Sequence, residues 1–364
     1  MADMHGESYL EVSLGALREN ARAIVEYVQA PVIGVVKCDG YGMSLEAAAK
    51  AWVEAGAAML GVSTPREALH LRRAGFDQEM LLLAPVADEG IFSDLLARNV
   101  IFTLSSLENA QNYARWAAGK TVRVHVAVDT GMGRFGIPWQ NTEALKELYA
   151  QKGFSFEGIF SHFAKAFEGE YGITKTQLER FLQVTDTLRA AGCPIGIRHM
   201  ANSNAALRFP QTRLDAVRVG SALTGRLFPK PPIPLRPPNP YLAQVVECKT
   251  LQKGDTTGYA AVCRVQKTTR AAIVAVGSEN GYGYVGGPDN YLLRDMVYYF
   301  RELFRLSRKL PYVTYKGKKL RLVGRVGNQY TLFDASGTDI QPGDYVEAQV
   351  PTVIPRTNLV FVEE

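Results

Sequence analysis

The chain has 364 residues, of which 47% are hydrophobic and 21% are charged, and its formal net charge is +5. This composition is ordinary for a globular protein and excludes wholesale disorder, while the length allows two domains or one large barrel with an appendage. The basic residues are scattered and form no stripe, which argues against nucleic acid as a partner. No apolar run approaches the ~18 residues of a membrane span, so we expect no membrane association.

The start of the chain and the cysteines indicate the compartment. The first residues, MADMHGESYLEV, include acidic side chains and lack the apolar segment of a signal peptide. The four cysteines are isolated, without metal-ligand spacing to one another or to histidine: Cys38, Cys193, Cys248 and Cys263. Such cysteines are typical of reduced thiols in a cytoplasmic protein, so we expect neither disulfides nor a metal site.

The first part of the chain alternates between apolar runs and helical patterns. A short strand is predicted over Tyr9–Val12, and Ser13 then begins an amphipathic helix. Capping-box sequences mark two more helix starts, at Thr64–Glu67 and at Ser105–Glu108. Eight further strands are predicted: Val32–Val36, Met59–Val62, Met80–Ala84, Val100–Leu104, Val122–Val128, Phe156–Phe160, Gly196–His199 and Leu214–Val219. Eight short strands separated by helices predict a (β/α)8 barrel; a doubly wound sheet is the alternative, but it seldom has eight evenly spaced units.

A barrel places its active site at the C-terminal ends of its strands. A lysine at the exit of a buried strand can lose hydration, which lowers its pKa and prepares it to form a Schiff base. Taken alone, Lys37 could equally be a solvated lysine at a strand end. Other reactive residues, however, also follow predicted strands: Arg134, His162, His199, Asn202, Ser203 and Arg218, with Gly220 and Ser221 beyond the last strand. The loops after the seventh and eighth strands are a common phosphate site in barrels.

One glycine-rich motif does not fit the chemistry that its pattern suggests. Gly131–Gly136 matches G-x-G-x-x-G and follows a strand. A dinucleotide site would need a helix to start there, within a first βαβ unit. Pro138 and Trp139 follow instead, and the strand is the fifth, so we do not expect a nicotinamide site.

The chain changes character at Pro229–Pro240, a stretch with seven prolines that predicts a stiff connector. Alternating strands follow, with a predicted helix at Asn290–Arg308. We therefore expect an N-terminal strand packed with the C-terminal domain (1–12), the barrel (13–228), a linker (229–240) and a mainly antiparallel β-domain (241–364).

Six short motifs in fixed order give the chain a family resemblance. They are VKCDGYG at Val36–Gly42, DTGMGRFG at Asp129–Gly136, SHFA at Ser161–Ala164, HMANS at His199–Ser203, RVGS at Arg218–Ser221 and GRV at Gly324–Val326. Over nearly its whole length the sequence resembles the alanine racemase family, pyridoxal 5'-phosphate enzymes with an N-terminal barrel and a C-terminal β-domain.

The resemblance implies roles for particular residues. Lys37 would hold the cofactor as a Schiff base and act as one base, and Tyr259 would be the second base, reaching the barrel of a partner chain in a homodimer. Arg218 would face the pyridine nitrogen. The remaining residues would bind the phosphate (Tyr41, Ser203, Gly220, Ser221), border the cofactor (His162, Asn202) or contact the substrate (Arg134, Asn328).

Racemisation removes the Cα proton from one face and returns it to the other, so two opposed acid/bases are required. Lysine and tyrosine ordinarily have pKa values of ~10.4 and ~10, and both must be lowered for work near neutrality. Neighbouring cations, His162 and Arg218, would help Tyr259. A pyridine nitrogen that faces Arg218 should stay unprotonated, which suits racemisation.

Four positions depart from the family pattern. Ala127 replaces a lysine that supports the carboxylate-binding arginine, and Ser278 and Thr352 replace tyrosines near the substrate. Asn328-Gln329 replaces a Met-Asp pair. Smaller and more polar residues there predict a wider pocket, and hence a substrate larger or more polar than alanine, such as serine.

The favoured interpretation is a pyridoxal-phosphate-dependent amino-acid racemase, an isomerase. A decarboxylase on the same barrel is one alternative, which Arg218 opposes because such relatives usually pair the ring nitrogen with a carboxylate. A cofactor carrier or regulator with little catalysis is another. The β-domain with Tyr259 opposes it, whereas Ala127 favours it slightly.

Overall fold

The computed structural model describes residues 8–167, 172–225, 227–237, 240–284, 296, 300, 310–351 and 358–363. The chain divides into two compact units, one of residues 13–238 with 363–364, the other of residues 1–12 with 239–362. The sequence predicted four segments (1–12, 13–228, 229–240 and 241–364), whereas the structure divides into two units, so the boundaries of the four segments stay a prediction. A helix was predicted over Asn290–Arg308, and all but two of its residues lie outside the described part of the chain. Thr352 also lies outside it.

The larger unit is a parallel barrel. Its strands are β2 (Val32–Val35), β3 (Met59–Val62), β4 (Met80–Leu82), β5 (Phe102–Leu104), β6 (Val122–Asp129), β8 (Phe154–Phe160), β9 (Ile197–His199) and β10 (Val217–Val219). They pair in the orders β10-β2-β3-β4 and β5-β6-β8-β9, with a short β7 (Ile137–Pro138) beside β6. Parallel bridges from Leu81 to Ile101 and from His199 to Ala216 join the two runs into a closed circle. The predicted (β/α)8 barrel is confirmed.

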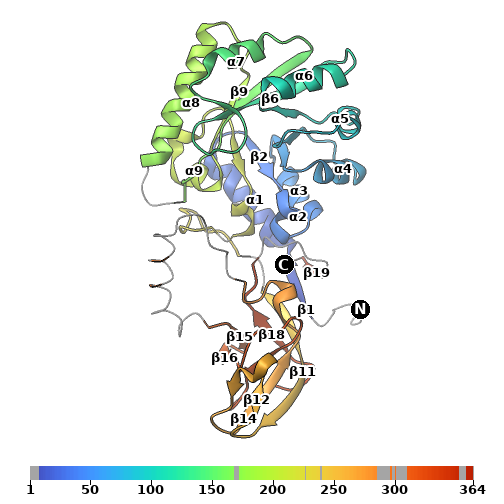
Figure 1. Cartoon of the computed structure of the whole chain (residues 1–364), viewed down its shortest axis with the longest axis vertical. Helices are drawn as coiled ribbons and strands as arrows, with labels where there is room; N and C mark the ends of the chain where they lie inside the picture. The colour runs from blue at the N-terminus through green and yellow to red at the C-terminus, as the bar shows by residue number, and fades with distance from the viewer. Residues whose placement is uncertain are drawn as a thin grey trace. The chain divides into compact units, whose positions relative to one another are not determined.

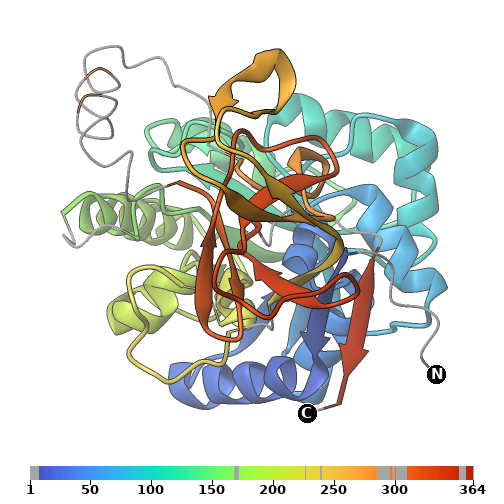
Figure 2. The same cartoon turned by 90° about the horizontal axis from the view of Figure 1, so that it is seen from below.

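Helices follow the strands and form an outer layer, seen as a ring in Figure 2 from blue α1 to green α8. They are α1 (Leu14–Val28), α3 (Leu45–Glu54), α4 (Pro65–Arg73), α5 (Glu89–Leu96), α6 (Leu107–Trp116), α7 (Thr142–Tyr149), α8 (Gly172–Ala190) and α9 (Ser203–Arg208), with short 3-10 turns η1 (Pro210–Thr212) and η2 (Ser221–Thr224) (Figure 1). None of the helices in the described part of the chain has the length and apolarity to cross a membrane.

The helix starts show which capping predictions hold. Thr64 caps α4, and both halves of its capping box with Glu67 are present. The second box is wrong. Ser106 caps α6 and accepts the Asn109 N–H at 3.0 Å, while the Asn109 side chain accepts the Ser105 N–H at 3.2 Å. Because the helix starts one residue later than predicted, Asn109 and not Glu108 occupies the position that completes the cap.

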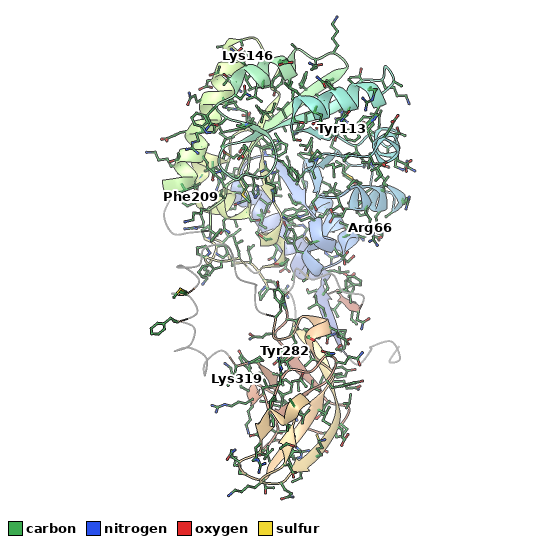
Figure 3. All side chains as sticks on the ribbon, viewed as in Figure 1. Arg66, Tyr113, Lys146, Phe209, Tyr282 and Lys319 are labelled. Carbon is green, nitrogen blue, oxygen red and sulfur yellow. The ribbon has the colours of Figure 1, made fainter. Side chains whose placement is uncertain are left out.

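Aromatic side chains join the outer helices to the strands. Tyr113 of α6, labelled in Figure 3, is fully buried, and its ring centroid lies 4.7 Å from that of Phe92 and 5.4 Å from that of Phe102. Its hydroxyl accepts the Val86 N–H at 2.6 Å. Burial of each such ring stabilises the barrel by roughly 1.5–3 kcal/mol, and this packing fixes α5 and α6 on β5.

The smaller unit is a mainly antiparallel sheet, as predicted. It contains β1 (Ser8–Ser13), β11 (Tyr241–Leu251), β14 (Thr269–Val274), β15 (Tyr312–Tyr315), β16 (Lys318–Arg321), β17 (Thr331–Asp334), β18 (Tyr345–Ala348) and β19 (Leu359–Val362). The long β11 pairs antiparallel with β1, β14 and β18. A small hairpin of β12 (Thr256–Thr257) and β13 (Cys263–Arg264) encloses η3 (Tyr259–Ala261), and η4 (Ser278–Asn280) follows β14. The sequence predicted strands in this unit at Leu242–Thr250, Ala271–Val276, Leu320–Val326, Tyr330–Phe333 and Tyr345–Val350, and it missed β12, β13, β15 and β19.

Candidate active site

A cavity of about 430 Å³ lies at the C-terminal ends of the barrel strands. It contains nine of the predicted site residues: Lys37, Tyr41, Arg134, His162, Asn202, Ser203, Arg218, Gly220 and Ser221. Apolar side chains, among them Val35, Leu83 and Phe160, form much of the remaining wall. Chain direction explains this gathering, because parallel strands bring all their following loops to one end of a barrel.

Two predicted residues, Tyr259 and Asn328, belong to the smaller unit. Tyr259 opens the η3 turn. Asn328 borders a second hollow of about 660 Å³ in that unit, where its amide oxygen accepts the Ser278 hydroxyl at 3.2 Å. Among the described residues, no group of three or more His, Cys, Asp and Glu side chains is arranged to hold a metal ion.

One edge of the cavity is a set of hydrogen-bond donors built around Ser203. The Ser203 hydroxyl oxygen accepts the N–H groups of Gly220 at 3.1 Å and of Ala222 at 3.3 Å. A hydroxyl has two acceptor sites and one donor, so the role left for Ser203 is to donate its own proton. Asn202 holds this residue in place, since its side chain caps α9 by accepting the Ala205 N–H at 3.1 Å.

Tyr41 completes this edge. Its oxygen accepts the backbone N–H of Ser221, and burial raises the pKa of the phenol, which therefore keeps its proton. Gly220 makes the close approach of the ring achievable, because a Cβ there would lie 2.3 Å from the Tyr41 Oη. Two neutral O–H donors and nearby backbone N–H groups together match an anion such as a phosphate ester.

Arg218 is buried in the wall beside His162. Its guanidinium donates to His199 Nδ1 at 2.8 Å and to the His199 carbonyl at 2.9 Å, and it contacts His162 Nδ1 at 3.2 Å. It also lies over the Phe160 ring, 5.1 Å from the centroid. Burial lowers the pKa of Arg218 to about 9, with a further contribution from the positive Arg134. Among the described residues, the hydrogen-bond partners of Arg218 are neutral imidazoles and backbone carbonyls, and none is a carboxylate.

A second histidine stands behind Arg218. Since His199 Nδ1 accepts from Arg218, its proton is on Nε2, which donates to His125 Nδ1 at 2.8 Å. His125 then carries its proton on Nε2, a buried atom. Burial lowers the pKa of His125 to about 3 and holds the pKa of His199 well below its ordinary value, so both rings are neutral. Sequence reasoning missed His125, whose only signal was a polar residue within the apolar strand β6.

The prediction that His162 is a cation is wrong. Burial lowers the pKa of His162 to about 3, and the positive charges of Arg218, Arg134 and Lys37 act in the same direction. The imidazole is therefore neutral, and the cations of the cavity are the lysine and the two arginines.

The loop that carries Arg134 is a compact turn around Asp129. One oxygen of this carboxylate accepts the N–H groups of Gly131 and Met132 at 2.9 Å and of Gly133 at 3.1 Å. The G-x-G-x-x-G segment is this turn, and the short β7 follows it in place of a helix. Ala127 adds an apolar patch to the cavity wall where the family pattern has lysine.

Helix α8 supports this loop with two residues that sequence reasoning missed. Arg180 donates to the Thr130 carbonyl at 2.9 Å. The Gln177 amide donates to the Thr130 hydroxyl at 3.3 Å and to the His162 carbonyl at 3.1 Å, so it links the loops after β6 and β8. Only the fold brings α8 to these loops, which explains why no sequence pattern marked either residue.

A barrel and an antiparallel β-domain, with lysine, arginine and phosphate-type donors in one barrel cavity, agree with the family resemblance of the sequence. Two family models match the chain, the alanine racemase N-terminal domain over residues 12–227 and the alanine racemase C-terminal domain over residues 241–352. The chain belongs to the alanine racemase family, whose members are isomerases that use pyridoxal phosphate.

Individual relatives agree with this assignment. The alanine racemase of Desulfosudis oleivorans is 33% identical over 359 residues, which cover 93% of this chain and 86% of the relative. That of Desulforamulus reducens is 34% identical over 330 residues, covering 87% and 83%. Among solved structures, alanine racemase from Clostridium difficile has a TM-score of 0.86 at 25% identity, covering 100% of this chain and 97% of that one. The Bacillus anthracis enzyme, solved with bound L-Ala-P, has a TM-score of 0.83 at 26% identity, covering 100% and 96%.

Proposed function

We propose that this chain interconverts L- and D-alanine, with pyridoxal phosphate in the barrel cavity and with Lys37 and Tyr259 as the two bases. The observation that carries the proposal is the meeting of Lys37, Arg218 and the phosphate-type donors in one cavity. The substrate is inferred from the relatives, which are named for alanine. A decarboxylase is less favoured because such relatives usually pair the ring nitrogen with a carboxylate, whereas the residue that would face it here is Arg218.

The residues present fit the cofactor. Ser203 and Tyr41 are left as donors by their own hydrogen bonds, and they border the same cavity as the backbone of Gly220 and Ser221. The absent Cβ of Gly220 lets the Tyr41 ring lie close against this backbone. Lys37 provides the amine for covalent attachment. Three cations line the cavity, while the Asp129 carboxylate is occupied by backbone N–H groups, so the site suits a ligand with a phosphate and a carboxylate.

The chemistry supplied by bound pyridoxal phosphate is electron withdrawal, which makes the Cα proton of an attached amino acid acidic. Lys37 accepts or returns this proton on one face, and Tyr259 does so on the other. With a pKa of about 9, Arg218 would donate a hydrogen bond to a ring nitrogen of the cofactor and keep its own proton. That restrains electron withdrawal and favours return of the proton over side reactions.

Arg134 is proposed to bind the substrate carboxylate, for which a guanidinium fork is well shaped. The Asp129 turn and the α8 contacts to Thr130 hold the loop from behind. Ala127 offers no charge to Arg134, so the support is backbone hydrogen bonding. The wider pocket expected from Ser278 and Thr352 stays a hypothesis, and it fails if purified protein turns over alanine far better than serine, lysine or arginine.

Trapping with borohydride tests the cofactor assignment. Reduction of the holoenzyme should fix pyridoxal phosphate to Lys37, detectable by peptide mass spectrometry, and Lys37→Ala should abolish the product. In deuterated water, L-alanine should gain deuterium at Cα and lose optical purity. Attachment to another lysine would refute the role of Lys37, and attachment without exchange would favour the cofactor carrier.

We further propose a homodimer in which Tyr259 serves the barrel of the partner. Mixing the inactive variants Lys37→Ala and Tyr259→Phe should then restore about a quarter of the activity, because half of the dimers are mixed and each has one intact site. A mixture that stays inactive while mixed dimers form would place both bases within one chain and refute the shared site.

A further inference from the structure

The chain directly after β2 takes a left-handed helical turn. Five consecutive residues have positive φ: Cys38 at 55°, Asp39 at 53°, Gly40 at 62°, Tyr41 at 58° and Gly42 at 80°. Only glycine adopts this region readily, and each residue with a Cβ is strained there. Three such residues, Cys38, Asp39 and Tyr41, lie within this run, so the turn requires an outside constraint.

The turn connects two residues of the proposed cofactor site. Lys37 begins it and Tyr41 lies four residues on, close to one helical turn away, and both line the same cavity. The Tyr41 end is fixed by the Ser221 N–H. The geometry of the lysine relative to the phosphate-type donors thus depends on how firmly this turn is held.

The constraint on the lysine end comes from Glu67 in α4, the helix marked by Arg66 in Figure 3. Glu67 Oε1 accepts the Cys38 N–H at 2.9 Å. Its other oxygen accepts the N–H groups of Ser63 at 2.8 Å and Thr64 at 3.0 Å, and the Ser63 hydroxyl at 3.1 Å. A capping box needs only the bond to Thr64. The bond to Cys38 joins α4 to the neighbouring βα unit.

The two oxygens of the Glu67 carboxylate therefore bind different segments of the chain. One oxygen caps its own helix, and the other holds the peptide that follows the lysine. Both oxygens accept from N–H groups, and hydrogen bonds to a charged acceptor are stronger than neutral ones. At the other end of the turn, Asp39 accepts the Leu45 N–H at 2.9 Å and closes the chain onto α3.

We infer that Glu67 is a positioning residue for Lys37, holding the left-handed turn that sets the lysine and Tyr41 at fixed places around the cofactor. This inference rests on the proposed function. It assigns no chemical step to Glu67, which acts through the Cys38 peptide. Its removal should therefore loosen the turn and weaken cofactor binding, beyond any effect on α4.

The test compares Glu67→Gln with Thr64→Ala, a matched control in the same cap that leaves the Cys38 N–H bond intact. Glutamine keeps one acceptor oxygen and presents an NH2 group to the remaining donors, so it cannot serve both sides. Apoprotein is titrated with pyridoxal phosphate by absorbance. We expect the dissociation constant to rise about tenfold in Glu67→Gln and to change less than twofold in Thr64→Ala.

Hydrogen exchange of the apoproteins gives a readout independent of activity. The peptide covering residues 37–43 should exchange faster in Glu67→Gln and as in wild type in Thr64→Ala, while peptides of α4 should change in both. If Glu67→Gln fails to fold, Glu67→Asp serves instead: it keeps the charge on α4 but is one methylene too short to bridge to Cys38, and the same result is expected.

Equal effects of Glu67→Gln and Thr64→Ala on cofactor binding and exchange would overturn the inference, because Glu67 would then be a helix cap only. Wild-type protein that takes up the cofactor in the same titration shows that the proposed function stands in that case. Wild-type protein that takes up none would overturn the proposed function, and this inference with it.

Discussion

The contact between Gly220 and Tyr41 gives a sharp prediction for cofactor binding. Gly220 has a negative φ of −139°, outside the left-handed region that favours glycine. The added Cβ would lie 2.3 Å from the Tyr41 Oη, 2.6 Å from Cε2 and 2.7 Å from Cζ. The main effect of Gly220→Ala should therefore be displacement of this one ring.

The magnitude follows from the packing. Tyr41 is held by the Ser221 N–H, so its ring can retreat only by breaking that bond. Overpacking of this kind costs about 1–3 kcal/mol, and a lost hydrogen bond costs about 1 kcal/mol. Because Tyr41 is also a proposed phosphate ligand, we expect Gly220→Ala to weaken pyridoxal phosphate binding by roughly 30- to 1,000-fold.

A double-mutant cycle isolates the contact. Tyr41→Ala removes the ring, so adding Gly220→Ala to it should change neither the urea midpoint of the apoprotein nor the cofactor dissociation constant. Gly172→Ala is the control, because a Cβ there would meet no atom within 4 Å. The reasoning is refuted if Gly220→Ala binds the cofactor as wild type does, or if it costs as much in the Tyr41→Ala background.

Three further predictions concern stability and substrate binding. Because burial lowers the pKa of His125 to about 3, only the unfolded chain takes up the His125 proton as the pH falls below about 6.5, and this costs the fold about 1.4 kcal/mol per pH unit. His162 and His199 have lowered pKa values as well, so His125→Phe should reduce the fall of the urea midpoint between pH 6.5 and 4.5 without abolishing it. The exposed His70→Phe should leave the slope as in wild type, and an unchanged slope in His125→Phe would contradict a neutral His125. Arg123 donates a hydrogen bond to the Glu157 carboxylate at 2.7 Å near the N-terminal end of β6, far along the strand from the cavity end. Arg123→Ala should therefore lower the free energy of unfolding by about 1–2 kcal/mol in urea titrations without changing kcat. A lower kcat would count against a purely structural role. Asp129→Ala removes the acceptor of three N–H groups in the loop that carries Arg134. It should raise the KM for alanine about tenfold and leave the cofactor affinity unaltered. An unchanged KM would show that the loop does not need this support.

Local sequence determined the framework of the barrel. Apolar runs such as Met59–Val62 predicted strands correctly, because a strand buried on both faces needs consecutive apolar residues and these are adjacent in the sequence. The order of chemistry-bearing residues after those strands placed Lys37 and Arg218 at one end, since parallel strands share a direction. Thr64 and Glu67 are three residues apart, so their capping box was also readable.

The tertiary structure decided the properties that depend on distant residues. His125 and His199 are 74 positions apart, and their hydrogen bond, with the tautomers it fixes, exists only because β6 and β9 lie close in the closed barrel. His162 is neutral because burial and three nearby cations outweigh its ordinary tendency to take up a proton, which no local pattern encodes. The left-handed turn after Lys37 contradicts the preferences of Cys38 and Tyr41, so only a contact from another unit of the barrel, such as that from Glu67, could hold it. Sequence thus specified which groups meet, while the fold specified their charge, tautomer and strain, because these are set by neighbours in space.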